Sequence, residues 1–149
     1  MERIEANEPY LSYALERYDQ LVTDLVDRGY AKDKIVLLGF SQGACLTAEY
    51  AVRHATRYGG VVIFTGGLIG PPGTRWDYGG TFAGTPLFLG SSDVDGWVPL
   101  ERVKESTAIF KKMGADVTER IYPGMGHLVN EDEITHARAI MESITQRQI

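Results

Sequence analysis

The stretch Lys34-Ile35-Val36-Leu37-Leu38-Gly39-Phe40-Ser41-Gln42-Gly43-Ala44 decides how the rest of the chain is interpreted. Its unbroken apolar run, 35–38, predicts a strand buried on both faces. Small residues then predict a helix packed closely on that strand. Strand, Gly-x-Ser-x-Gly and helix is the context of a nucleophile elbow, in which the flanking glycines leave room and Ser41 stands on a strained turn. The alternative is an ordinary turn in which Ser41 only caps the helix.

The composition is that of a soluble globular protein. The chain has 149 residues, of which 44% are hydrophobic and 23% charged, so we expect a single domain over 1–149. Its net charge of −5 argues against nucleic acid or an anionic membrane as a partner. Cys45 is the only cysteine, which fits a reducing compartment. Because neither a signal-peptide pattern nor an apolar run of about 18 residues occurs, we expect a cytoplasmic protein.

Strands and helices alternate along the sequence. This order predicts an α/β fold whose parallel sheet has about four strands, with helices on both faces. The strand at 35–38 should be central, whereas the alternating pattern of 116–122 predicts a half-exposed edge strand. The expected strands are 35–38, 61–65, 86–90 and 116–122, and the expected helices are 7–29 with Asn7 as N-cap, 41–57, 99–113 and one capped by Asn130 with Glu133.

Polar residues follow three of these strands, where sites form in parallel sheets. Ser41 follows the first strand, Asp93 and Asp95 the third, and His127 the fourth. A hydroxyl, a carboxylate and an imidazole in this chain order are typical of an α/β-hydrolase triad. The serine needs a base to become a nucleophile, the histidine supplies it near neutral pH, and a carboxylate orients the histidine. A structural loop histidine is the alternative for His127, and the spacing alone leaves both aspartates open.

Three segments carry a family resemblance, Gly39-Phe40-Ser41-Gln42-Gly43, Asp95-Gly96-Trp97-Val98-Pro99 and Gly124-Met125-Gly126-His127. They resemble the phospholipase/carboxylesterase family of α/β-hydrolases, which includes bacterial carboxylesterases and acyl-protein thioesterases. The resemblance covers nearly the whole chain and implies a shortened α/β-hydrolase fold. It gives the carboxylate role to Asp95 and leaves Asp93 as a turn-forming loop residue.

The sequence also departs from this family. The family's early strands and the His-Gly-x-Gly loop that supplies one oxyanion-hole amide have no counterpart here. The resemblance then leaves the N–H of Gln42 as the oxyanion donor, and one missing donor costs about a hundredfold or more in rate. The strand at 35–38 would have a bare edge, so we expect a homodimer or higher homo-oligomer.

The resemblance implies a serine carboxylesterase that hydrolyses short-chain carboxylic esters or thioesters through an acyl-enzyme. Leu68, in a long glycine-rich loop, and Trp97 are the apolar candidates for its substrate pocket. The alternative is a truncated, weakly active or inactive hydrolase-fold protein that acts through self-association or binding. We expect no cofactor and no metal, because no Gly-x-Gly-x-x-Gly follows a strand and the three histidines are scattered.

Overall fold

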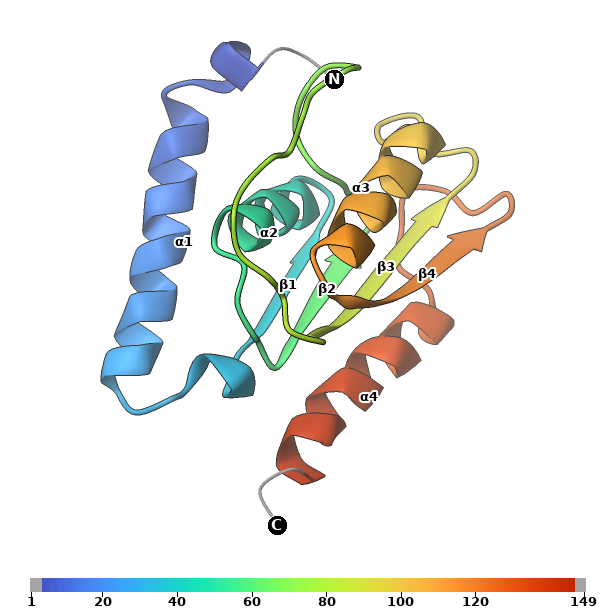
Figure 1. The fold of residues 1–149 in the computed structure, drawn as a ribbon. Coiled ribbons are helices and arrows are strands. Elements are labelled where there is room, and N and C mark those ends of the chain that lie inside the picture. Colours follow the sequence, from blue (N-terminus) through green and yellow to red (C-terminus); the bar gives the residue numbers. More distant parts are fainter. Residues whose placement is uncertain (1–3, 147–149) are drawn as a thin grey trace.

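Four parallel strands form one sheet in the order β1-β2-β3-β4 (Figure 1). The computed structural model describes residues 4–146. Strands that follow one another in the chain are neighbours in the sheet, and a helix or a long loop makes each crossover. The predicted parallel sheet of about four strands is therefore confirmed. The strands are β1 (Val36–Phe40), β2 (Gly60–Phe64), β3 (Pro86–Ser92) and β4 (Asp116–Tyr122), and the helices are α1 (Tyr10–Asp27), α2 (Gln42–Arg53), α3 (Leu100–Lys112) and α4 (Glu131–Gln146).

Helices cover both faces of this sheet, as predicted (Figure 1). On one face α2 packs against β1 and β2, and α3 packs against β3 and β4. Helix α1 lies outside α2 on the same side, while α4 crosses β2 and β3 on the other face. The all-apolar sequence of β2 is explained by this arrangement, because Val61 and Ile63 enter the larger core and Val62 and Phe64 the smaller one.

Strand β1 differs from its prediction. Ile35 and Leu37 are buried, with 7% and 3% exposure, but Leu38 and Phe40 on the opposite face are 42% and 43% exposed. Among the described residues β1 is an edge strand that pairs only with β2. Because α4 packs on β2 and β3, no described helix covers this face at β1. The prediction of burial on both faces was therefore wrong, whereas the bare edge expected at this strand and the half-exposed edge strand at β4 are both confirmed.

The helix ends follow local side-chain chemistry. Asn7 was predicted to cap the first helix, but α1 begins at Tyr10, and the carboxylate of Glu8 accepts a hydrogen bond from the N–H of Ser12 at 3.2 Å. The capping box of α4 is confirmed. The N–H of Glu133 donates to Oδ1 of Asn130 at 2.9 Å, and the N–H of Asn130 donates to Oε1 of Glu133 at 3.2 Å.

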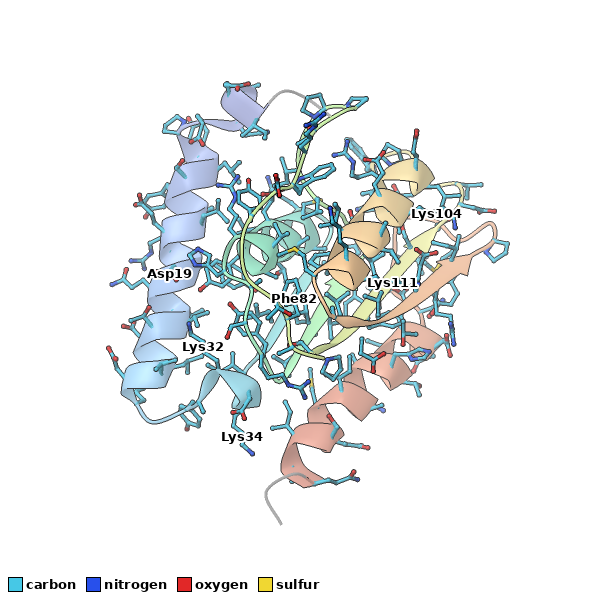
Figure 2. The ribbon with its side chains drawn as sticks, viewed as in Figure 1. Asp19, Lys32, Lys34, Phe82, Lys104 and Lys111 are labelled. Atoms are coloured by element: carbon cyan, nitrogen blue, oxygen red, sulfur yellow. The ribbon has the colours of Figure 1, made fainter. Side chains whose placement is uncertain are left out.

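The long segment between β2 and β3 is packed against the helices rather than free. Trp76 and Phe82 are 7% and 0% exposed. The Phe82 ring meets the Phe110 ring of α3 edge to face at 5.6 Å, and Figure 2 shows Phe82 in the interior, between the loop and α3. Trp76 and Phe82 therefore belong to the main core.

Candidate active site

Ser41 stands on a sharp turn between β1 and α2. Its φ of 57° and ψ of −117° are unfavourable for a residue with a side chain. A Cβ at Gly39 would collide with the backbone carbonyl of Gly43, which explains the first glycine of the motif. A Cβ at Gly43 would meet no atom within 4 Å, so the expectation that both glycines provide room holds only for Gly39.

Ser41, His127 and Asp95 form a continuous hydrogen-bonded chain at the carboxyl edge of the sheet. Oγ of Ser41 lies 2.7 Å from Nε2 of His127, and Nδ1 of His127 lies 2.7 Å from Oδ2 of Asp95. With an ionised Asp95 accepting the proton of Nδ1, Nε2 is left as the acceptor for the Ser41 hydroxyl. The three sequence-predicted residues are thus brought together from three separate loops.

The Asp95 carboxylate is fixed within its own loop. Its side chain has 0% exposure, and its Oδ1 accepts hydrogen bonds from the N–H groups of Trp97 at 2.7 Å and Val98 at 3.2 Å. Burial raises the pKa of Asp95, but the hydrogen bonds from His127 and from these two amides lower it by more, so its pKa lies below the ordinary value. The carboxylate therefore stays ionised and able to orient His127.

Asp93 has a different position. Its Oδ1 accepts a hydrogen bond from the N–H of Gly124 at 2.8 Å, three residues before His127. Asp93 and Asp95 thus join the same two loops at two points, but only Asp95 lies within hydrogen-bond distance of the imidazole. Gly124 has a φ of +68°, a conformation that favours glycine.

Two contacts around His127 were not anticipated from the sequence. The ring of Phe40 lies 5.3 Å from the imidazole, centroid to centroid. The hydroxyl of Thr65, at the end of β2, donates to the carbonyl of Leu128 at 3.3 Å. Thr65 has a φ of +57°, which is rare for a β-branched residue. In the sequence, Thr65 stands out only as a polar residue directly after an apolar strand. Its hydrogen-bond partner Leu128 lies 63 residues away along the chain, so the sequence alone could not identify this contact.

An apolar cavity of about 600 Å³ opens beside Gln42, the residue that follows Ser41. Gln42 begins α2, so its N–H has no acceptor within the helix and is available near Ser41. The cavity is lined by residues of α1 and the segment before it, of the first turns of α2, and of the loop after β2. Its lining residues are Ala6, Asn7, Tyr10, Leu11, Ala14, Gln42, Gly43, Cys45, Leu46 and Ile69.

The two predicted pocket residues lie elsewhere. Leu68 has 0% exposure and belongs to the main core, so it offers no surface to a substrate, and its neighbour Ile69 lines the cavity instead. Trp97 is 79% exposed and is not among the residues that line this cavity. A glycine-rich loop has no periodicity from which the cavity-facing residue could have been identified.

Residues 4–146 contain neither a candidate metal site nor a candidate membrane-spanning helix. There, no three His, Cys, Asp or Glu side chains come together in a way that could hold a metal ion. Over the same range, no helix combines the length and the apolar character needed to cross a membrane.

Comparison with known proteins gives a consistent result. The model of the phospholipase/carboxylesterase family matches residues 2–145. A crystal structure of a phospholipase/carboxylesterase from Dyadobacter fermentans is 39% identical and superposes with a TM-score of 0.89, covering 97% of this chain and 68% of that one. The Bacillus cereus carboxylesterase structure, at 18% identity and a TM-score of 0.71, covers 90% of this chain and 61% of its own and shares the fold.

The curated relatives that match this chain are longer than it is. Acyl-protein thioesterase 1 of Gibberella zeae is 28% identical over 83% of this chain and 54% of its own length. A probable carboxylesterase of Oryza sativa is 25% identical over 84% of this chain and 53% of its own. The chain therefore spans about half the length of the curated relatives it matches.

Proposed function

The chain belongs to the phospholipase/carboxylesterase family, and on this premise we propose that it is a serine hydrolase of short-chain carboxylic esters or thioesters. The observation that carries the proposal is the chain of two 2.7 Å contacts from Ser41 through His127 to Asp95. A buried carboxylate, an imidazole and a serine on a strained turn are the groups that acyl transfer to serine needs.

The reaction proceeds in two halves. Oγ of Ser41 attacks the carbonyl carbon while Nε2 of His127 takes its proton, and the resulting tetrahedral intermediate carries a negative oxygen. His127 then returns the proton to the leaving oxygen or sulfur, and the acyl group remains on Ser41. Water repeats the sequence, with His127 as base and then as acid, and releases the carboxylic acid. Asp95 holds the imidazole and stabilises its charged form throughout.

The oxyanion is stabilised by the amino end of α2. The N–H of Gln42 lies at the first position of the helix, where the helix dipole adds positive potential. The His-Gly-x-Gly loop that supplies a second donor in the family has no counterpart in this sequence, and one missing donor lowers the rate about a hundredfold or more.

The apolar cavity suits the acyl chain of the substrate. It adjoins Gln42 and is walled by Ala6, Ala14, Leu46 and Ile69. Each methylene buried there contributes about 0.8 kcal/mol, and a chain that extends past the wall gains nothing further. We therefore propose a preference for short acyl chains. The free thiol of Cys45 favours a reducing, cytoplasmic location.

The proposed function is tested with a fluorophosphonate label and p-nitrophenyl acetate and butyrate. We expect stoichiometric labelling of Ser41, steady turnover of both esters, and loss of both in Ser41→Ala and in His127→Ala with the fold retained. Turnover at the wild-type rate by a Ser41→Ala sample freed of contaminating esterase would refute the mechanism.

We propose further that the chain self-associates through β1. Leu38 and Phe40 are more than two-fifths exposed on an edge strand, and the run 35–38 has no lysine, proline or glycine that would discourage pairing with another strand. A two-fold interface would cover this face in both copies. Sedimentation or light scattering at micromolar concentration tests this proposal.

A further inference from the structure

The cavity wall at Ile69 is held by two buried charged side chains. Glu49 of α2 is 1% exposed and Arg102 of α3 is 5% exposed. Both side chains contact the loop that follows β2, one from α2 and the other from α3. Burying charges is costly unless they are paired and hydrogen-bonded, so the contacts that these two residues make are informative.

Glu49 holds Ile69 directly. Its Oε1 accepts hydrogen bonds from the N–H of Ile69 at 2.8 Å and from Nε1 of Trp76 at 3.1 Å. Its Oε2 accepts from Nε of Arg53 at 3.0 Å. The carboxylate thus ties the backbone of the wall residue to the helix that begins at the oxyanion donor.

Arg102 holds the residues on either side of Ile69. Its Nη1 donates to the carbonyls of Leu68 at 3.0 Å and Gly70 at 2.6 Å, and its guanidinium lies over the Trp76 ring at 4.8 Å. The N–H of Leu68 also donates to Oγ of Ser106 at 2.9 Å. Three consecutive residues of a glycine-rich loop are therefore fixed by hydrogen bonds to side chains of α2 and α3.

This arrangement links the wall to the reacting groups. Helix α2 begins at Gln42, the proposed oxyanion donor, and α3 begins five residues after Asp95. Side chains of the same two helices fix the loop at Ile69. A loop held on only one side could move away from a long acyl chain. Held on both sides, the backbone at Ile69 is fixed relative to α2, the helix that begins at Gln42.

We propose that Glu49 and Arg102 are positioning residues that fix Ile69 as the wall of an acyl-chain site and so set the acyl length that the enzyme accepts. The proposal rests on the esterase function proposed above. It adds to it two residues that touch no reacting atom and one, Ile69, that contacts the hydrocarbon part of the substrate.

The test measures selectivity, the ratio of kcat/KM for p-nitrophenyl octanoate to that for p-nitrophenyl acetate. Ile69→Ala should change this ratio about tenfold, since a few methylene contacts in an apolar pocket are worth that much. Glu49→Asp keeps the charge but is too short to reach Ile69, and should change the ratio comparably. Glu49→Gln keeps an acceptor oxygen at the right length, and should stay within about threefold of the wild type.

The matched control is Glu142→Gln. Glu142 is an exposed residue of α4, on the other face of the sheet from α2 and α3, and it is not among the residues that line the cavity. Its neutralisation should leave the ratio and both rates unchanged. An unchanged ratio in folded Glu49→Asp, or equal changes in Glu49→Asp and Glu49→Gln, would overturn the positioning role.

A binding measurement separates this inference from the proposed function. Octanoate is titrated into the wild-type protein while the methyl resonances of Ile69 are followed by NMR. A saturable shift that Glu49→Asp weakens supports the site even if no ester is hydrolysed. Ester hydrolysis without any shift at Ile69 would overturn the site and leave the esterase function standing.

Discussion

At the scale of single residues, Ser41 is held in its turn at a cost in stability. Ser41 keeps a φ of 57° and a ψ of −117°, and such conformations cost about 1–3 kcal/mol in a residue with a Cβ. The turn directs Oγ toward Nε2 of His127 at 2.7 Å. The strain is therefore tied to the position from which the hydroxyl can attack a substrate.

This cost predicts that Ser41→Gly is more stable than Ser41→Ala. Glycine adopts this conformation without the Cβ penalty, whereas alanine keeps the penalty. We expect Ser41→Gly to unfold at a Tm about 2–4 °C higher, which corresponds to about 1 kcal/mol in a chain of this size. Thermal unfolding followed by circular dichroism measures it, and equal Tm values for the two variants would show that the turn is unstrained.

The two aspartates predict different mutational effects. Asp95→Asn removes the charge that orients His127, so we expect kcat to fall about a thousandfold or more. Asp93→Asn keeps an acceptor oxygen for the N–H of Gly124, and the loss should stay below about tenfold. Ester hydrolysis at pH 7 to 8 measures both. The reverse order of effects would move the orienting role to Asp93.

At the scale of elements, the sequence predicted what depends on neighbours in the chain. The Asn130–Glu133 capping box and the alternation of β4 are local patterns, and both were found as expected. The strained Thr65 and the wall residue Ile69 were missed, because each is defined by a hydrogen bond to a residue at least 20 positions away. Strand β1 was misjudged because its apolar sequence does not say which element covers each face.

Helix α4 carries a prediction about pH. Glu133 has 0% exposure, and its Oε2 has no hydrogen-bond partner within residues 4–146. Burial and the nearby charge of Asp132 raise its pKa, more than the hydrogen bond from Asn130 lowers it. A raised carboxyl pKa means that the folded state loses stability as pH rises from the unfolded pKa, about 4.3, through the folded one.

Glu133→Gln should therefore raise Tm at pH 8 and leave it nearly unchanged at pH 4. Glutamine keeps the acceptor for the N–H of Asn130 but removes the buried charge. Thermal unfolding at the two pH values tests this, with Glu142→Gln as the control for an exposed charge on the same helix. A Tm gain of equal size at both pH values would show that the effect is not ionisation of Glu133.

At the scale of the whole molecule, the hydrogen-bonded chain of Ser41, His127 and Asp95 lies next to the uncovered part of the sheet. Phe40 follows Leu38 on the exposed face of β1, and its ring lies 5.3 Å from the His127 imidazole. Any polypeptide that covers β1 would therefore come close to the reacting groups. Assembly and catalysis are expected to be coupled through this face.

The association prediction follows from the same face. Leu38→Lys places a charge on the exposed side of the edge strand, where a pairing chain would have to bury it. We expect the wild type to be dimeric or larger at micromolar concentration and Leu38→Lys to shift toward the monomer, measured by sedimentation velocity. Ala108→Lys, at an exposed position of α3, is the control and should leave the mass distribution unchanged. A wild type that remains a soluble monomer would contradict the proposal.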